Sequence, residues 1–242
     1  MAGNVFGNPV TDDIVRLIYP DVKDVTPQLR AKVAFQYMNA EGRDVNCKNF
    51  VQNLKQRYGN GISALCMLFN ATGSSITYVG NHDWHGHIYE SPYPSVIQNG
   101  QWVGFCMSTP LHGRPDRNPL LYIAARTMLE IVVIGCLHGA FPMSVIIMVL
   151  RIGHSRQAYT EIREAKHYET DHWDRIKGLL ENKSTHATDT WNGCYSVATI
   201  GEGTSPEFVG IMSLDGVISE RSAATLITLA ADSATEDKED KE

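Results

Sequence analysis

The sequence lacks the motifs that mark several large classes of enzyme. It contains no Gly-rich phosphate loop of the GxGxxG or GxxxxGK[ST] type and no nucleophile elbow. No positively charged stretch followed by an apolar run opens the chain, so we expect a cytoplasmic protein. The five cysteines form no CxxC pair, which favours reduced, buried thiols. Together these absences predict a non-enzymatic protein that carries no cofactor.

Positive charge is also scarce. The 242 residues carry a formal net charge of -6, with a pI near 5.8. No basic patch is visible, which argues against nucleic acid as a partner. The length is sufficient for one sizeable hydrophobic core. Residues 232–242 end in the charged run TEDKEDKE and are expected to form a disordered tail.

The first segment, residues 1–61, is predicted to be helical. Thr26 followed by Pro27 is a typical helix start, and apolar residues then recur at helical spacing until Gly42. A second helix is expected from Asn46 to the Gly-Asn-Gly stop at residues 59–61. The apolar stripes on both helices are interpreted as packing surfaces.

Residues 62–231 show the period of strands and are predicted to form a β-sandwich domain. Strands are expected within residues 62–69, 75–79, 95–105, 158–167, 194–200 and 207–214. Asn99-Gly100 favours a hairpin turn, and Asp171 is expected to cap a helix over residues 171–182. The predicted fold is therefore mainly β, of the α+β class: an antiparallel sandwich with N-terminal helices and one helix near residues 171–182.

Residues 106–155 differ from the rest of this domain. The run 131–150, IVVIGCLHGAFPMSVIIMVL, contains no Asp, Glu, Lys or Arg and has the length of a membrane span. A single-span membrane protein is therefore one alternative. However, Gly, His, Pro and Ser interrupt the run, and no Trp or Tyr lies at its ends. As a soluble helix the run would lack a polar face, and as one strand it would be unusually long.

A frameshift in the coding sequence is the explanation that we prefer for this segment. Synonymous codons for Cys106–Gly153, read one base out of step, yield a stop-free peptide that contains the strand-like segments SAAVYRG and CDWMLAWS. Two compensating single-base errors, near Phe105 and near residues 153–157, would account for both boundaries. The hypothesis implies that residues 106–155 as printed fail to complete the sandwich, because they lack period-2 alternation.

The segment NHDWHGHIYESPYP, residues 81–94, holds the densest group of metal-binding residue types. His82, His85 and His87, with Asp83, are suitable zinc donors. His85 and His87 would share one face of a strand, but His82 and Asp83 would need a turn to join them, and no HExxH helix accompanies them. Zinc binding through His82, His85 and His87 is therefore kept as an alternative, and the main prediction is that the protein holds no metal.

The same region supports a binding function. The candidate ligand-binding residues are Trp84, His85, His87, Tyr93 and Trp102, because aromatic rings in loops suit lipid headgroups and sugar faces. The competing interpretation is that Trp84 and Trp102 are core anchors, since large aromatic side chains dominate core burial.

A second polar cluster contains His167, Glu169, Asp171 and His172 and directly precedes the predicted helix. Acidic residues are expected at a helix start, so the cluster is interpreted as a cap. We therefore assign no catalytic residue.

Seven blocks of unusual sequence carry a resemblance to the jasmonate-induced protein family of plants. The blocks are NAEGRDVN, YGNGIS, DWHGHI, SPYPSVIQNGQW, AYTEIREA, DTWNGC and TSPEF. The resemblance implies a protein made in response to jasmonate or stress. The expected strand order is also remotely similar to actinoporin-like β-sandwiches, which include the lipid-binding protein nakanori. Because a fold does not determine a function, no lipid-binding residue is carried over. A membrane lipid headgroup or a glycan is the expected partner, and the oligomeric state stays open.

The frameshift hypothesis is tested by resequencing the transcript across codons 100–160. We expect single-base differences near the codons for Phe105 and for residues 153–157. A transcript that encodes the printed residues throughout would show that the hypothesis is wrong.

Overall fold

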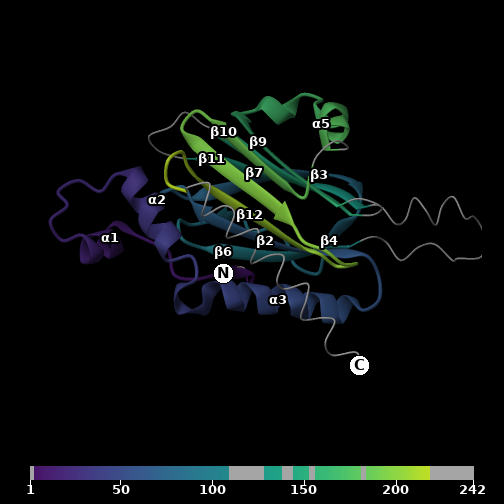
Figure 1. Cartoon of the computed structure of the whole chain (residues 1–242), viewed down its shortest axis with the longest axis horizontal. Coiled ribbons are helices and arrows are strands. Elements are labelled where there is room, and N and C mark those ends of the chain that lie inside the picture. The colour runs from purple at the N-terminus through teal and green to yellow at the C-terminus, as the bar shows by residue number, and fades with distance from the viewer. Residues whose placement is uncertain (1–2, 109–127, 138–143, 153–155, 181–183, 219–242) are drawn as a thin grey trace, which may run out of the picture.

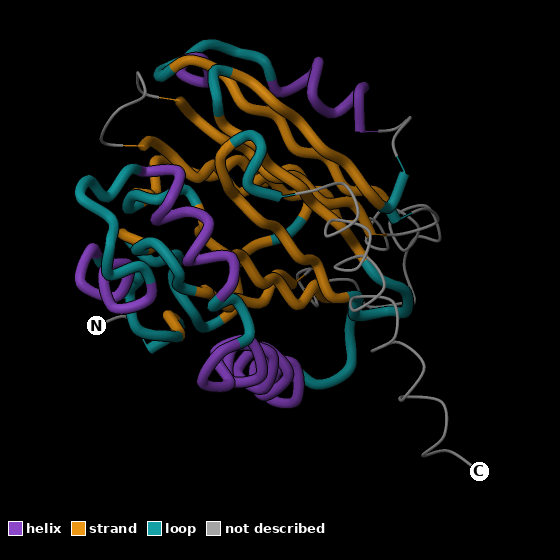
Figure 2. The backbone as a smooth tube through the Cα atoms, turned by 60° about the vertical axis from the view of Figure 1, so that its left-hand side comes forward, coloured by secondary structure: helices purple, strands orange, loops and turns teal. Residues whose placement is uncertain are grey.

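The chain folds as a β-sandwich with helices on both outer faces (Figures 1 and 2). The computed structural model describes residues 3–108, 128–137, 144–152, 156–180 and 184–218, without the side chains of residues 85, 128–137 and 145. The predicted tail at residues 232–242 lies outside these ranges. The mainly β class and the sandwich architecture are confirmed.

The larger sheet, called sheet 1 below, lies at the centre of the molecule. Its strands, in spatial order, are β1 (Val5–Phe6), β6 (Trp102–Ser108), β2 (Ser63–Ala71), β12 (Glu207–Leu214), β11 (Cys194–Ile200) and β10 (His186–Trp191), and β4 (His87–Tyr89) also pairs with β6. Neighbouring strands are antiparallel except β2 and β12, which run parallel.

Sheet 2 packs face to face on sheet 1, and its neighbouring strands are all antiparallel. Its strands, in spatial order, are β5 (Val96–Ile97), β3 (Ile76–His85), β7 (Met128–Leu137), β8 (Ser144–Ile152) and β9 (Gln157–Glu164).

Strand β2 is buried along its whole length because sheet 1 is covered on both faces. Its residues alternate between two cores, as the period-2 geometry of a strand requires. Cys66 and Leu68 belong to the core between the sheets, whereas Met67 and Phe69 belong to the core beneath the N-terminal helices. One strand thus joins both hydrophobic cores.

The N-terminal helices form a layer against the outer face of sheet 1 (Figure 1). They are α1 (Asp12–Ile18), α2 (Pro27–Gln36) and α3 (Arg43–Tyr58), with a short 3-10 helix, η1 (Ala40–Gly42), between the last two. As predicted, the Thr26 hydroxyl accepts a hydrogen bond from the backbone N–H of Leu29 at 3.2 Å. Because β1 pairs within sheet 1, the first 61 residues are part of the same folded unit as the sandwich.

Strands β3 and β4 carry the chain from one sheet to the other. Gly86, which separates them, has φ 156. A second transfer occurs at Asn99-Gly100, which links β5 of sheet 2 to β6 of sheet 1. The predicted hairpin at this dipeptide is therefore wrong. The Asn99 side chain instead bonds to the backbone of three other segments, through Val10, Arg30 and Gly73.

The prediction that the printed residues 106–155 fail to complete the sandwich is wrong for the part described. Strands β7 and β8 close sheet 2 between β3 and β9. Strand β8 needs no polar face because both of its faces are covered. Ile146 and Met148 pack between the sheets, while Ile147 and Val149 pack beneath α5 (Trp173–Leu180). Residues 109–127, 138–143 and 153–155 lie outside the described ranges, and the frameshift itself stays a prediction.

The single-span alternative is also wrong for residues 131–150. Their described part belongs to the paired strands β7 and β8 rather than to a helix. Among the residues described, no helix has the length and apolar character needed to cross a membrane.

Helix α5 matches the helix predicted near residues 171–182 and covers the outer face of sheet 2. Its backbone begins at Trp173, whose N–H donates to the Asp171 carboxylate at 3.3 Å, as expected for an acidic cap. Ile176 and Leu180 are fully buried against β8 and β9. The helix therefore supplies the second buried face that β8 requires.

We expect Ile176→Ala to lower the free energy of unfolding by about 2–4 kcal/mol, because it opens a cavity beneath α5. Leu179→Ala is the matched control on the same helix. Leu179 is 37% exposed, and its loss should cost less than about 1 kcal/mol. Urea denaturation of both variants measures the difference. Equal losses would contradict the assigned role of α5 in covering the sheet.

Candidate functional site

Aromatic rings gather on the outside of sheet 2, where strand β3 meets the start of α5. This aromatic surface consists of His82, Trp84, Tyr168 and Trp173. The ring of His82 stacks on Trp173 with 4.6 Å between centroids and 7° between planes, and it meets Trp84 edge-on at 5.0 Å. The ring of Tyr168 also stacks on Trp173, with 5.6 Å between centroids. All four rings are partly exposed.

Local chain geometry explains why these rings meet. His82 and Trp84 both lie on β3, where the pairing with β7 shifts register between Asp83 and His85, and their rings meet there. Lys166, with φ 71, turns the chain after β9 into the 3-10 helix η2 (His167–Glu169). Trp173 then starts α5. Trp84, Tyr168 and Trp173 pack their inner sides against the core beneath α5 and leave their outer sides accessible.

A buried carboxylate fastens this surface to the sheet. Glu161 of β9 is 1% exposed. It accepts hydrogen bonds from Tyr159 at 2.6 Å and Tyr168 at 2.8 Å. Arg175 of α5 donates to both of its oxygens, at 2.7 and 3.1 Å, and Arg163 donates at 2.8 Å. The carboxylate thus ties η2 and α5 to β9.

The charge state of Glu161 follows from these contacts. Burial opposes ionisation, but the hydrogen bonds from Arg175, Tyr159 and Tyr168 outweigh it and lower the pKa of Glu161 to about 2. Two phenolic hydroxyls and two guanidinium groups therefore surround a carboxylate that stays ionised throughout the physiological pH range.

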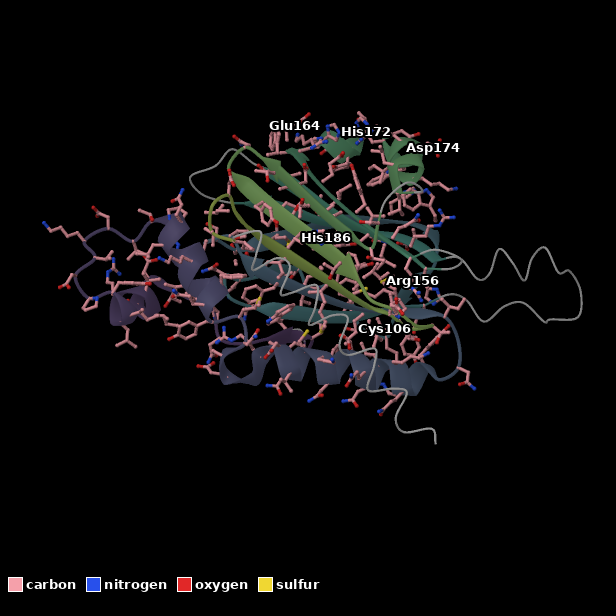
Figure 3. The ribbon with its side chains drawn as sticks, in the orientation of Figure 1. Cys106, Arg156, Glu164, His172, Asp174 and His186 are labelled. Atoms are coloured by element: carbon pink, nitrogen blue, oxygen red, sulfur yellow. The ribbon has the colours of Figure 1, made fainter. Side chains whose placement is uncertain are left out.

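Two further histidines lie beside the aromatic surface. The rings of His167 and His172 stack with 4.1 Å between centroids and 5° between planes. His167 Nδ1 lies 3.1 Å from the Glu164 carboxylate, and His172 Nε2 lies 2.9 Å from the Thr170 hydroxyl. Figure 3 shows Glu164 and His172 along the outer rim of the molecule, close to Asp174.

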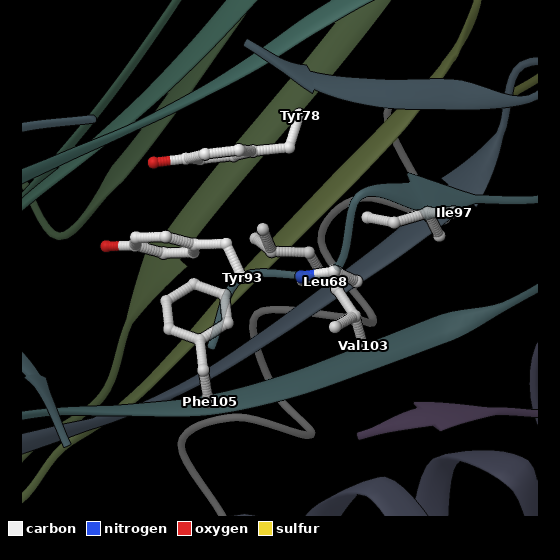
Figure 4. Close-up of a pocket in the computed structure, with 7 residues that line it drawn as sticks. Leu68, Tyr78, Tyr93, Ile97, Val103 and Phe105 are labelled. Carbon is white, nitrogen blue, oxygen red and sulfur yellow. The ribbon is translucent and has the colours of Figure 1, made fainter. Parts of the chain in front are cut away.

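Tyr93, a predicted site residue, lies apart from this surface at the open edge between the sheets. Its ring stacks on Tyr78 with 4.8 Å between centroids and 16° between planes, and it meets Phe105 edge-on (Figure 4). The cavity next to them has a volume of about 10 Å³, room for a single water. The Tyr78–Tyr93 pair therefore closes the core and does not form a ligand cavity.

The other predicted site residues are dispersed. Trp102 is 4% exposed, packs against the Phe69 ring in a tilted arrangement and donates from Nε1 to the carbonyl of Met38 at 2.8 Å. It is a core anchor and unavailable to a ligand. His87 lies on β4 of sheet 1, beside Ser108. The side chain of His85 lies outside the described part. Of the predicted residues whose side chains are described, only Trp84 belongs to the aromatic surface.

The alternative of a zinc site requires the side chains of His82 and His87 to lie close together, but the structure places them in different sheets. His82 pairs with sheet 2 and stacks on Trp173, whereas His87 pairs with sheet 1. Over the described residues, no group of three or more His, Cys, Asp or Glu side chains is arranged to hold a metal. The cysteines with described side chains, Cys47, Cys66, Cys106 and Cys194, are all buried.

The sequence interpretation missed Tyr168 and Trp173. The sequence indicates only an acidic cap at the start of this helix, because His82, which stacks on Trp173, lies far away in the sequence on β3. The available signal was the aromatic pair Tyr168 and Trp173 on either side of the histidines. This pair indicates a surface cluster only once the fold is known, because the fold places β3 beside the start of α5.

Comparison with known proteins identifies related sequences and folds. The 23 kDa jasmonate-induced protein of Hordeum vulgare is 39% identical over 216 residues, which cover 87% of this chain and 98% of that protein. The Nakanori-like protein family matches residues 3–116. The crystal structure of the lipid binding protein Nakanori superposes with a TM-score of 0.74 and 20% identity, over 86% of this chain and 99% of that chain. A wild-type Xerocomus chrysenteron lectin aligns with a TM-score of only 0.39 and 13% identity, over 63% of this chain and all of that chain.

We expect Glu161→Gln to destabilise the protein at neutral pH by up to about 3 kcal/mol, the free energy corresponding to the lowered pKa. The folded-state pKa is depressed, so the stabilisation is present above the unfolded glutamate pKa of about 4.3. It is lost as pH falls from there towards 2. The difference between wild type and Glu161→Gln should therefore shrink over this range.

Chemical denaturation at a series of pH values measures this difference. Glu164→Gln is the control, because this carboxylate of the same strand is exposed and its ion pair with His167 lies at the surface. A difference between wild type and Glu161→Gln that does not change with pH would contradict the assignment of the depressed pKa to Glu161.

Proposed function

Because the chain belongs to the jasmonate-induced protein family, we propose that it is a stress-response protein that binds membrane lipid headgroups through its aromatic surface. Binding at this surface requires no chemical step, and we propose that the protein is not an enzyme. A cytoplasmic location is part of the same proposal, which lets the protein meet the inner faces of cellular membranes.

The partly exposed rings of His82, Trp84, Tyr168 and Trp173, which contact one another, carry this proposal. Tryptophan and tyrosine favour the interface between water and lipid because their rings combine an apolar body with a polar atom. The Glu161 contacts fix the positions of η2 and α5 before a ligand arrives, which reduces the entropy lost on binding.

The net charge indicates which headgroups are suitable. A formal net charge of -6 opposes long-range attraction to an anionic membrane surface. Headgroups that are zwitterionic or uncharged therefore fit the surface better than anionic ones. The name of the similarly folded Nakanori, a lipid binding protein, is consistent with this proposal.

We expect the protein to sediment with phosphatidylcholine vesicles, and Trp84→Ala and Trp173→Ala each to weaken this binding roughly tenfold or more. Leu17→Ala is the control, since Leu17 is 81% exposed on α1, at the opposite side of the sandwich. It should bind like wild type. Thermal unfolding of each variant confirms that it is folded before vesicles are added.

Two outcomes would contradict the proposal. One is the absence of binding to zwitterionic and uncharged vesicles. The other is equal binding by the Trp84→Ala, Trp173→Ala and wild-type proteins. A sugar that binds in place of lipid and is lost with the same two variants would assign the aromatic surface to carbohydrate instead.

A further inference from the structure

A polar groove lies at the edge of the sandwich away from the aromatic surface. Its volume is about 600 Å³, within the range of small-molecule sites. Three segments line it: the chain around β1, the start of α3, and the loop on both sides of β5. The lining residues that the argument uses are Asn8, Arg43, Asn46, Ser95, Gln98 and Gln101.

Arg43 forms the fixed base of this groove. The side chain is 2% exposed and donates hydrogen bonds to three backbone carbonyls, those of Ala40 at 2.9 Å, Asn8 at 3.3 Å and Gly100 at 2.8 Å. It also donates to the Glu41 carboxylate at 3.1 Å. Because these partners belong to all the segments that line the groove or flank it, one side chain holds the walls together.

A second contact holds the groove open at the same place. Gln101 donates from Nε2 to the carbonyl of Gly7 at 2.9 Å and accepts from the backbone N–H of Gln98 at 3.0 Å. Gly7 has φ 90, and a Cβ there would lie 3.0 Å from Arg43 Cδ. The absence of a side chain at Gly7 is therefore what lets β1 approach Arg43.

Above this fixed base, several polar side chains have unused hydrogen-bonding capacity. Asn8, Asn46, Ser95 and Gln98 are exposed, and in the described part of the chain their side chains make no hydrogen bond. A side-chain amide both donates and accepts, as a hydroxyl group does. The charge of Arg43 is balanced by Glu41, so the groove offers little attraction to an ionic ligand.

We propose that this groove binds a neutral, hydroxyl-rich ligand, either a free oligosaccharide or the sugar headgroup of an uncharged glycolipid. The amides of Asn8, Asn46 and Gln98 exchange hydrogen bonds with sugar hydroxyls. The apolar side chains of Val5 and Val96 lie against the C–H groups of the sugar. The groove shares no residue with the aromatic surface, so this inference is independent of the proposed function.

The test uses the full chain and two kinds of probe. A panel of neutral oligosaccharides is screened by ligand-observed NMR, and vesicles of phosphatidylcholine with a dihexosyl diacylglycerol are screened by sedimentation against phosphatidylcholine alone. We expect binding in one arm or both, weakened roughly tenfold by Asn46→Ala and by Gln98→Ala, since each removes an amide that bonds the ligand. Asn53→Ala is the matched control, an exposed asparagine two turns further along the same face of α3.

The two kinds of probe distinguish the two possible sources of the ligand. Binding of free oligosaccharide assigns a soluble glycan, and binding only to glycolipid vesicles assigns a membrane glycan. In either case, the Asn53→Ala and Trp84→Ala proteins must bind the oligosaccharide as wild type does, or show the same increase in vesicle binding when the glycolipid is present. Absence of binding in both arms overturns the proposal. So does a sugar-dependent signal that is unchanged in Asn46→Ala and Gln98→Ala, or one that Trp84→Ala abolishes.

Discussion

The burial of sheet 1 on both faces is the constraint on which the rest of the molecule depends. Leu68 and Phe69 are neighbours on β2, point to opposite faces and are both fully buried. Neither face of the strand can meet water, so the sheet requires a helical layer on one side and a second sheet on the other. The N-terminal helices are therefore a structural necessity of the sandwich.

Sheet 2 is also buried on both faces at β8, and this determines where the aromatic surface lies. Strand β8 is apolar on both faces, so sheet 2 also needs an outer cover. Helix α5 provides it through Ile176 and Leu180, and η2 adds Tyr168. A short helix buries only part of each large ring that it carries. The accessible sides of Tyr168 and Trp173 follow from this partial cover, and Glu161 keeps the cover in place.

Features that depend on neighbouring residues were predictable from the sequence. The Thr26 cap, the Asp171 cap and the strands Cys194–Ile200 and Glu207–Leu214 match the prediction, because caps and turns act locally. Contacts between distant segments were not predictable. The partner of Trp173 is His82, Trp102 points inwards to Met38, and the apolar run 131–150 forms strands because other segments cover it. In each case the deciding partner lies elsewhere in the chain.

The passage of the chain from β3 to β4 fixes the number of residues between two aromatic side chains. Trp84 faces outwards on sheet 2, and Tyr89 packs against the core of sheet 1, with Gly86 alone between the two strands. Successive residues of a strand face opposite ways, so inserting or deleting one residue here would invert one strand relative to the other. Exposed loops elsewhere tolerate insertions, but the spacing between these two aromatic residues does not.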